Sequence, residues 1–533
     1  MTRVHLPWQP IALIAILLLA LALRLAPWGQ NRFLEDEALY ATWGLQIATG
    51  ADPMLDLEPV DKPPLHPYTL ALSFWLSSPS MATGVGAGHE TAARLPSLLA
   101  SLASIVLVYA LGRQLPSPDR RPQDAGGSEG AALLAALLLA LSPFDILFSS
   151  TAFTDPLMTT FVLGALLAAA TDRLGAAGLL AGLAAATKQQ SLFFLPLVVA
   201  TALLSPRHLA PTNPEEPVHR EGKARPGSGA LTWLKKIWNQ RWVRFVLGFL
   251  LVAAGVLWWD TARLQRPGFL QQSLISYGRL ALAHPGDWVS RAAEWLRWAG
   301  SFWVSPWFNV FLLAAIGLWF ACGLARWWPG PSRIDLAFGA FVLAFLLLHW
   351  LVSFQIWDRY LLGLVPLVAL LAARALVALG LAIPAAPWRR VYAVAVGAFL
   401  AISLAGPVLQ AAHSELPLGG DHGAYDGIDQ LAAYLRTQAP PGSVLYDHWL
   451  GYHYRFYLYG APLRIHWYPD LPDLAQDATV YRREPRYIAF PTWRDSTPDE
   501  AALAEAGIHL IPLFQTTRRD GTTSFRLYRL EGP

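Results

Sequence analysis

Cysteine, charge and nucleotide-binding motifs are scarce in this sequence. The single cysteine, Cys322, lies in an apolar run, which excludes an intramolecular disulfide framework and a thiolate metal cluster. Charged residues make up 14% of the chain and the formal net charge is only +3, so nothing favours nucleic-acid binding. The glycine-rich stretch GVGAGHE (84–90) lacks the GxGxxG spacing and a preceding strand, and we expect it to be a plain loop.

Long apolar runs are what the sequence has in abundance. A helix of about 20 apolar residues crosses the ~30 Å hydrocarbon core of a bilayer. The repeated runs therefore predict a polytopic α-helical membrane protein with about eleven transmembrane helices. These are the segments 9–27, 94–112, 131–150, 153–171, 174–187, 190–205, 243–260, 302–325, 335–354, 360–382 and 391–410. Pro27, Trp28 and Gly29 make a poor cleavage site, so we interpret the first run as an uncleaved anchor. The run PLHPYTLALSFWL (64–76) is too short to cross upright and predicts an interfacial or re-entrant helix.

The basic residues set the predicted orientation. Lys and Arg concentrate in cytoplasmic loops of membrane proteins. With a cytoplasmic N-terminus, the inside loops hold most of the clusters, including Arg113, Arg120, Arg121, Arg173, Lys235, Lys236, Arg389 and Arg390. An odd number of spans then places the C-terminal part outside. We expect a multi-pass protein of the plasma membrane.

The chain divides into two predicted domains. Residues 1–410 form the transmembrane domain, with a first extracytoplasmic loop (28–93), a flexible cytoplasmic linker (206–242) and a further outer loop (261–301). Residues 411–533 form a small extracytoplasmic α/β domain. GIDQLAAYLRTQAPPG has an amphipathic helix pattern, and SVLYD, RYIAF, HLIPLF and SFRLYRL are short β-type runs.

Four charged sites fall on one predicted face of the membrane. They are Asp36-Glu37, the stretch DKPPLHPY (61–68), Asp155, and Asp358-Arg359-Tyr360. Each has an ordinary structural alternative. Acids favour the first turn of a helix, Lys62 fits a snorkelling anchor, Asp155-Pro156 fits a helix start, and Arg359-Tyr360 fits an interfacial belt. Four such coincidences on one face favour a functional site.

The chemistry of these residues indicates a phosphate site beside a base. A partly desolvated carboxylate has a raised pKa and is a better base once ionised. Pro63 and Pro64 stiffen the chain after Lys62, so that its ammonium is held by a rigid turn. The planar fork of Arg359 matches phosphate oxygens. A basic site at interface depth suits a lipid-linked phosphate.

The ordered set of motifs resembles the membrane glycosyltransferases of the GT-C superfamily. The set runs EDEALYA, DKPPLHPY, ARLPSLLASLASIVLVYALGRQL, FTDPLMTTF, GLAAATKQQSLFFLP and WDRYLLGLVP. The nearest branch is that of the protein O-mannosyltransferases and the bacterial lipid A aminoarabinose transferase. The resemblance covers about residues 9–410 and reaches into the tail.

That resemblance implies a reaction and roles for individual residues. It implies transfer of a hexosyl or pentosyl group from a polyprenyl-phosphate donor, on the extracytoplasmic face, with inversion. Asp36 matches the expected general base, and Glu37 and Asp155 match its acidic companions. Lys62 and Arg359 are expected at the donor phosphate. The residues expected beside them, with less direct matches, are Tyr360 and Arg279, and Lys188 matches a Thr-Lys element at an outer helix end.

Cofactor and acceptor stay open at this point. No cofactor is required, although a divalent cation could bridge Asp61 or Asp155 to the phosphate, and Asp61 and His284 are the candidate metal ligands. The acceptor could be a protein, a lipid or an envelope glycan. The alternative function is a transporter or flippase, which would depend on charges inside the spans and commonly shows repeated halves. A third is a non-catalytic assembly factor that uses the tail as a binding module.

Overall fold

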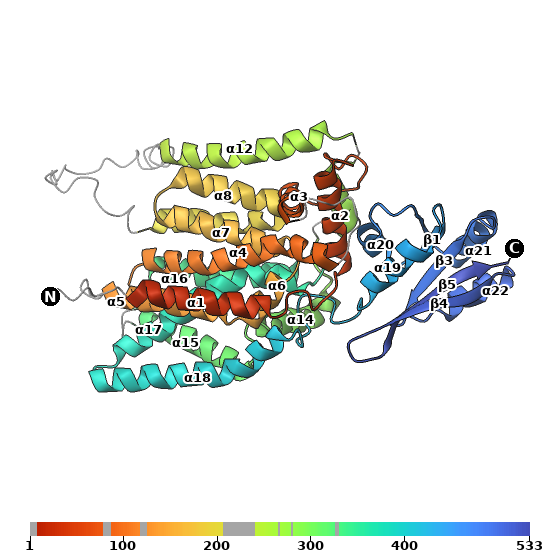
Figure 1. Cartoon of the computed structure of the whole chain (residues 1–533). Coiled ribbons are helices and arrows are strands. Elements are labelled where there is room, and N and C mark those ends of the chain that lie inside the picture. The colour runs from red at the N-terminus through yellow and green to blue at the C-terminus, as the bar shows by residue number, and fades with distance from the viewer. Residues whose placement is uncertain are drawn as a thin grey trace, which may run out of the picture.

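A long helical bundle and a smaller mixed domain make up the molecule (Figure 1). The structure is a computed structural model, and it describes residues 8–77, 87–117, 125–205, 240–264, 267–278, 281–325 and 330–532. The short helix α2 (Glu35–Thr49) lies across the end of the bundle, between the long helices and the C-terminal domain.

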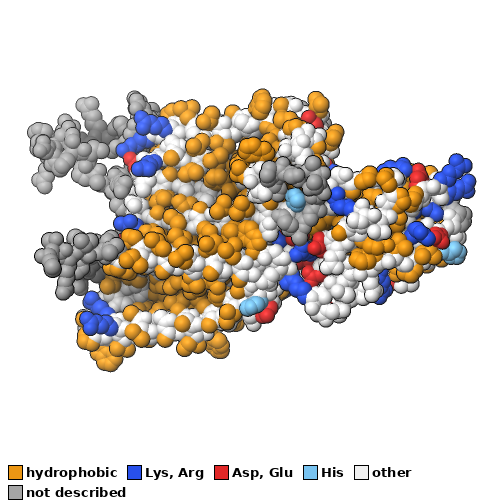
Figure 2. Space-filling view, viewed as in Figure 1, with side chains coloured by type: hydrophobic (Ala, Val, Ile, Leu, Met, Phe, Trp, Pro, Cys, Tyr) orange, Lys and Arg blue, Asp and Glu red, His pale blue; other side chains and the backbone are white. Residues whose placement is uncertain are grey.

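Seven described helices are long and apolar enough to cross a membrane by length and composition. They are found in α1 (Trp8–Leu25), α4 (Ala87–Gln114), α12 (Gln240–Ala262), α15 (Pro306–Leu324), α16 (Arg333–Leu351), η4 (Asp358–Leu364) with α17 (Val365–Ala382), and α18 (Ala386–Ala412). An eighth span is counted if α5 (Ala125–Ala140) and α6 (Pro143–Ser149), bent by 59° at their junction, are one. Apolar side chains cover the visible flank of this bundle (Figure 2).

Shorter helices complete the bundle and its outer end. The apolar ones are α7 (Asp155–Ala170), α8 (Leu174–Thr187), and η2 (Gln189–Phe194) continuing into α9 (Leu195–Leu204). The connecting ones are α3 (Leu65–Ser77), α13 (Phe269–Tyr277), η3 (Pro285–Asp287) and α14 (Trp288–Gly300). Ser142 caps the N-terminus of α6. Pro143 is the first residue of this helix, a position that suits proline because the amide hydrogen it lacks would be unpaired there.

Glycine allows α8 and α12 to touch backbone to backbone. A Cβ at Gly178 would lie 1.9 Å from the carbonyl oxygen of Phe245, and one at Gly248 would lie 2.5 Å from that of Gly175. Small residues at such a seam let two helices approach more closely than side chains permit. Helix α12 is otherwise largely exposed, so this seam is its main attachment to the bundle.

The C-terminal domain is a five-stranded sheet with helices. Its strands are β1 (Val444–Asp447), β2 (Arg464–Trp467), β3 (Arg486–Pro491), β4 (His509–Thr517) and β5 (Thr523–Glu531), in the order β2-β1-β3-β5-β4. β1 pairs in parallel with β2 and β3, while β5 pairs antiparallel with β3 and β4. The helices are α19 (Ile428–Gln438), α20 (Gly451–Tyr457), α21 (Leu471–Val480) and α22 (Thr497–Glu505).

The predicted fold class, a polytopic helical protein with a small C-terminal α/β domain, is confirmed. Helices occupy each of the eleven predicted segments, but 174–187 and 190–205 hold only short apolar helices and 131–150 holds the bent pair. Helix α3 forms where the short run 64–76 predicted one. Most of the predicted linker 206–242 and residues 84–86 of the glycine-rich stretch lie outside the described residues, whereas residues 87–90, expected to be loop, begin α4.

Candidate active site

Three acid–base pairs meet at the end of the bundle that faces the C-terminal domain. Asp36 Oδ2 accepts a hydrogen bond from Arg359 Nη2 at 2.6 Å. Lys62 Nζ lies 3.1 Å from Asp61 Oδ2, and Lys188 Nζ lies 2.6 Å from Asp155 Oδ1. These residues come from α2, the loop before α3, the start of α7, the end of α8 and η4, so segments far apart in sequence converge here.

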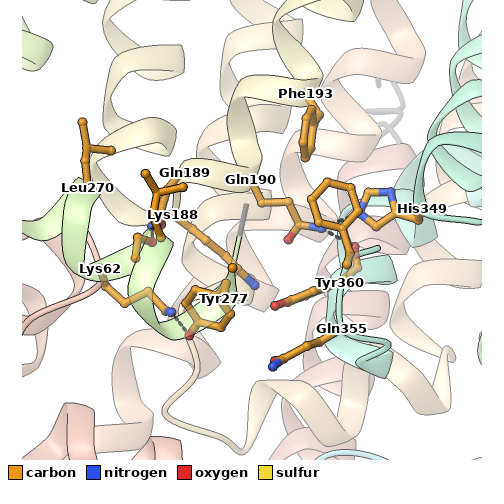
Figure 3. Close-up of a pocket in the computed structure, with 14 residues that line it drawn as sticks. Lys62, Lys188, Gln189, Gln190, Phe193, Leu270, Tyr277, His349, Gln355 and Tyr360 are labelled. Atoms are coloured by element: carbon orange, nitrogen blue, oxygen red, sulfur yellow. Dashed lines mark hydrogen bonds between the residues drawn. The ribbon is translucent and has the colours of Figure 1, made fainter. Parts of the chain in front are cut away.

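A cavity of about 450 Å³ opens beside these pairs (Figure 3). Both lysines, Lys62 and Lys188, line it, and so do the rings of Tyr277 and Tyr360. The remaining lining residues are Gln189, Gln190, Phe193, Leu270, Ser273, Leu274, Gly278, His349, Phe354 and Gln355. Most of the exposed wall surface is apolar, although nine of the fourteen lining residues carry a polar group and two of these groups are ammoniums. Such a wall suits a ligand that has an apolar body and an anionic head.

Lys62 is held from two sides. Tyr277 accepts a hydrogen bond from the Lys62 ammonium, which also lies 4.1 Å from the centre of the tyrosine ring (Figure 3). Burial lowers the pKa of Lys62, and the carboxylates of Asp61 and Asp36 oppose that effect. An ammonium that has lost much of its hydration gains strongly from an incoming anion.

Arg359 pairs with Asp36 and directly precedes Tyr360, a residue of the cavity wall. Its guanidinium packs against the rings of Phe153 and Trp357, at 4.6 and 4.8 Å from their centres. Lys188 lies 4.4 Å from the ring centre of Tyr360, the residue that follows Arg359. Arg359 interacts electrostatically with both Asp36 and Asp155, so the three pairs form one charged cluster.

Glu37 occupies a different environment from its neighbour Asp36. The Glu37 side chain is fully buried and accepts hydrogen bonds from the backbone amides of Ala152 and Leu34, at 2.7 and 3.0 Å. Arg94 Nε lies 3.6 Å from the same carboxylate, and burial raises the pKa of Glu37. Glu37 thus ties α2 to the loop before α7 and is not among the residues that line the cavity, and its catalytic role stays a prediction.

Several predicted residues lie elsewhere. Arg279 lies outside the described residues. His284 is exposed at the start of η3, where its Nδ1 accepts a hydrogen bond from the amide of Gly286 at 3.2 Å. Among the residues that the structure describes, no three His, Cys, Asp or Glu side chains group to hold a metal ion, and Asp61 pairs with Lys62 instead. A divalent cation that bridges Asp61 or Asp155 to a donor phosphate stays a prediction.

Most residues of the cavity wall have no signal in the sequence. Tyr277, His349 and Gln355 belong to none of the motifs identified in the sequence, and Gln190, which lies within GLAAATKQQSLFFLP, had no predicted role. Lys188 gave a usable signal: a charged residue directly after an apolar helix needs a partner, and Asp155 supplies it.

Comparisons with known proteins agree with this architecture. The family described as Dolichyl-phosphate-mannose-protein mannosyltransferase matches residues 61–214. The crystal structure of ArnT from Cupriavidus metallidurans in the apo state matches with a TM-score of 0.62 at 16% identity, over 98% of this chain and 99% of that one. The same protein bound to undecaprenyl phosphate matches with a TM-score of 0.58, at the same identity and coverage. No curated protein matches the chain. The chain is thus a multi-pass membrane protein with the GT-C glycosyltransferase fold, and its residues 61–214 match the mannosyltransferase family.

Proposed function

We propose that this protein is an integral membrane glycosyltransferase that moves a sugar from a polyprenyl-phosphate donor to an acceptor hydroxyl on the extracytoplasmic face, with inversion. The observation that carries the proposal is the cavity in which Lys62 and Lys188 stand among apolar side chains, with the Asp36–Arg359 pair at its side. The ArnT structure of the same fold holds undecaprenyl phosphate, which supports a lipid-phosphate ligand for this cavity.

The donor fits the cavity by its two chemical parts. The isoprenoid chain contacts the apolar wall, where Leu270 and Leu274 are each 53% exposed. The phosphate meets the ammonium groups of Lys62 and Lys188, and the guanidinium of Arg359, which interacts electrostatically with both lysines, supplies a bidentate partner. Fixed cations in a partly dry site stabilise the charge that develops on the leaving phosphate.

Asp36 is the proposed general base. In the structure it is neutralised by Arg359, while its side chain remains 34% exposed. A bound phosphate competes for Arg359 and so frees the Asp36 carboxylate to accept a proton. The acceptor oxygen then bonds to the anomeric carbon from the face opposite the phosphate. The bond between that carbon and the phosphate oxygen breaks, its electron pair leaves with the polyprenyl phosphate, and the hydroxyl proton passes to Asp36.

The distribution of basic residues supports the proposed sidedness. Arg113 ends α4, Arg241 begins α12, and Arg389 and Arg390 lie in the first turns of α18. These positions fall at the end of the bundle opposite the C-terminal domain, where Lys and Arg gather on the visible surface (Figures 1 and 2). The positive-inside rule places that end in the cytoplasm, and hence the cavity and the C-terminal domain outside.

The test is turnover of a synthetic undecaprenyl-phosphate sugar by purified protein, with washed cell membranes as the source of acceptor. Asp36→Asn should reduce the rate by about 10²- to 10⁴-fold, the usual contribution of a general base, with an unchanged melting temperature. Glu415→Gln, which alters an exposed carboxylate outside the cavity lining, is the matched control. Wild-type turnover by Asp36→Asn would show that the base is wrongly assigned, and a product with retained anomeric configuration would exclude direct displacement.

A further inference from the structure

A second cavity, of about 630 Å³, lies where the C-terminal domain meets the start of α2. Its lining residues are Glu35, Asp447, His448, Trp449, Gly451, Tyr452, Arg455, Ile465 and Trp467. Apart from Glu35 they come from the carboxyl ends of β1 and β2 and from α20. β1 and β2 are parallel, and Asp447 is the register partner of Trp467. In open α/β sheets, ligands bind in the crevice outside the carboxyl ends of parallel strands.

Aromatic rings in this cleft are exposed to an unusual degree. Trp449 is 46% exposed, Tyr452 44% and Trp467 61%. The ring of His448 is near both indoles: its centre is 4.5 Å from that of Trp449 and 6.3 Å from that of Trp467, whose plane is within 18° of its own. A cluster of exposed aromatics in a concave site marks a binding surface. Indole faces carry negative potential, so they attract the polarised C–H groups on the flat face of a sugar ring.

Hydrogen-bonding groups surround these rings. Asp447 is 5% exposed, and its Oδ1 accepts from the amide of Leu450 at 2.6 Å. A Cβ at Gly451 would lie 2.6 Å from Asp447 Oδ2, so glycine leaves room beside this carboxylate. Glu35 is exposed and accepts a hydrogen bond from Tyr425. Carboxylates placed beside aromatic rings can accept hydrogen bonds from sugar hydroxyls.

The charge of the cleft limits the classes of ligand that it can bind. It holds two carboxylates, Glu35 and Asp447, and its one arginine, Arg455, forms an ion pair with Glu58. Burial raises the pKa of Asp447 to about 6, and the amide of Leu450, which donates to this carboxylate, opposes that shift. A phosphorylated ligand would meet like charges here, whereas a neutral sugar or an amino sugar would not.

The cleft reaches toward the proposed base. Glu35 directly precedes Asp36 in α2. Burial raises the pKa of Tyr452, and the charges of Asp36 and Asp61 add to that shift, so Tyr452 lies within electrostatic reach of the active-site acids. We propose that this cleft binds a neutral or amino sugar residue of the acceptor and presents one of its hydroxyls to Asp36. The proposal rests on the proposed function and names the class of its acceptor: a glycan or glycolipid.

The first test is direct binding, which needs neither donor nor turnover. Cellobiose and the disaccharide of glucosamine are titrated against the purified full-length protein by saturation-transfer NMR. Binding in the millimolar range is expected for the wild type, and Trp449→Ala and Trp467→Ala should each weaken it about tenfold. Trp467→Phe, which keeps a ring, should recover part of the affinity. Trp388→Ala, a 66% exposed tryptophan at the far end of α18, is the matched control.

The outcomes separate this inference from the proposed function. Equal disaccharide binding by the wild type and by the Trp449→Ala/Trp467→Ala double variant would overturn the inference, as would no binding by the wild type. Tryptophan-dependent binding of a serine- and threonine-rich peptide in place of either disaccharide would assign the cleft to a protein acceptor and would also overturn it. Sugar binding that depends on the two tryptophans, in a protein that never consumes a polyprenyl-phosphate sugar, would keep the site and refute the transferase.

Discussion

Two kinds of buried ion pair lie within the bundle and at its outer end, and their surroundings differ. Arg24 and Asp145, deep between α1 and α6, have side chains exposed by 0% and 6%. Every Arg24 nitrogen has a partner, because the guanidinium also donates to Ser101 and to the carbonyl oxygens of Ala20, Leu139 and Ala140. Asp36 and Arg359 at the cavity keep side-chain exposures of 34% and 11%. The sealed pair holds helices together, whereas the open pair can exchange partners with a ligand.

Glu37 and Asp36 show the same contrast between adjacent residues. Glu37 is fully buried beside Arg94, so it resembles the sealed Arg24–Asp145 pair. Asp36 is partly exposed and belongs to the open pair with Arg359. Helix α2 turns about 100° per residue, so neighbouring side chains point in different directions. The comparison separates stability from activity: a sealed pair should fail by unfolding, and an open pair should fail in catalysis with the fold intact.

The largest effect is expected at the sealed pair. Asp145→Ala leaves the Arg24 guanidinium buried without its carboxylate, which should cost about 3–5 kcal/mol in the free energy of unfolding. Denaturant unfolding of the detergent-solubilised protein measures the loss. A variant as stable as the wild type would mean that water reaches Arg24 and that this pair is not sealed.

Substitution of Lys62 should reduce activity and leave stability almost unchanged, the opposite of what is expected for Asp145→Ala. Lys62→Met removes an ammonium from the cavity and keeps the length of the side chain, so we expect kcat/KM for the lipid-phosphate donor to fall by about 10²- to 10³-fold. The melting temperature should stay close to that of the wild type. Unfolding in step with the loss of activity would place Lys62 among the sealed residues.

Glu37→Gln tests whether the network is structural. The amide preserves the shape of the side chain but weakens its contacts with Arg94 and with the two backbone amides, at an expected cost of about 1–3 kcal/mol in stability. Activity measured per folded molecule should remain near the wild-type value. A loss of turnover comparable to that of Asp36→Asn, at unchanged stability, would return Glu37 to a catalytic role.

Tyr277 should have a smaller effect. Tyr277→Phe removes the hydroxyl that contacts Lys62 and keeps the ring beneath the ammonium, so the lost interaction is one hydrogen bond of about 0.5–1.5 kcal/mol. We expect kcat/KM to fall by about 2- to 10-fold. Steady-state kinetics with the same donor will measure this, and an effect as large as that of Lys62→Met would mean that the hydroxyl contacts the substrate itself.

A chelator should have the smallest effect of all. Lys62, Lys188 and Arg359 already supply positive charge to a phosphate, so we expect turnover in excess EDTA to equal turnover without it. Turnover that stops on chelation and returns with added Mg²⁺ or Mn²⁺ would require carboxylates such as Asp61 to leave their lysine partners for a metal.

The length of the apolar runs and the residues at turns made most helices and strands of the fold predictable. All four predicted β-type runs are strands, but β2 (RIHW) was missed, because four half-exposed residues have no clear alternation. The helix at EDEALYA was treated only as an alternative to a functional loop, although three acids in a first turn favour it. The number of spanning helices was harder to predict from the sequence. The bend at Leu141–Ser142, which decides whether α5 and α6 count as one span, depends on packing.

The charged residues of the site were predictable, because a charged side chain at the end of an apolar segment stands out in the sequence. Asp36, Lys62, Asp155 and Arg359 converge at one end of the bundle, as the sequence analysis expected. Which acid is sealed and which is open could not be deduced, because it depends on the tertiary positions of Arg94 and Arg359. Tyr277 and His349 line the cavity, but nothing in the sequence indicated that they would.

The glycine contact between α8 and α12 has a consequence for how a lipid reaches the cavity. Where the backbone of Gly178 touches that of Phe245, no slot remains wide enough for an isoprenoid chain, so this flank of the bundle is a closed wall to substrates diffusing in the bilayer. The lipid-linked donor of the proposed reaction would have to enter by a different flank. An added methyl group at Gly178 would wedge the two helices apart and make a gap there.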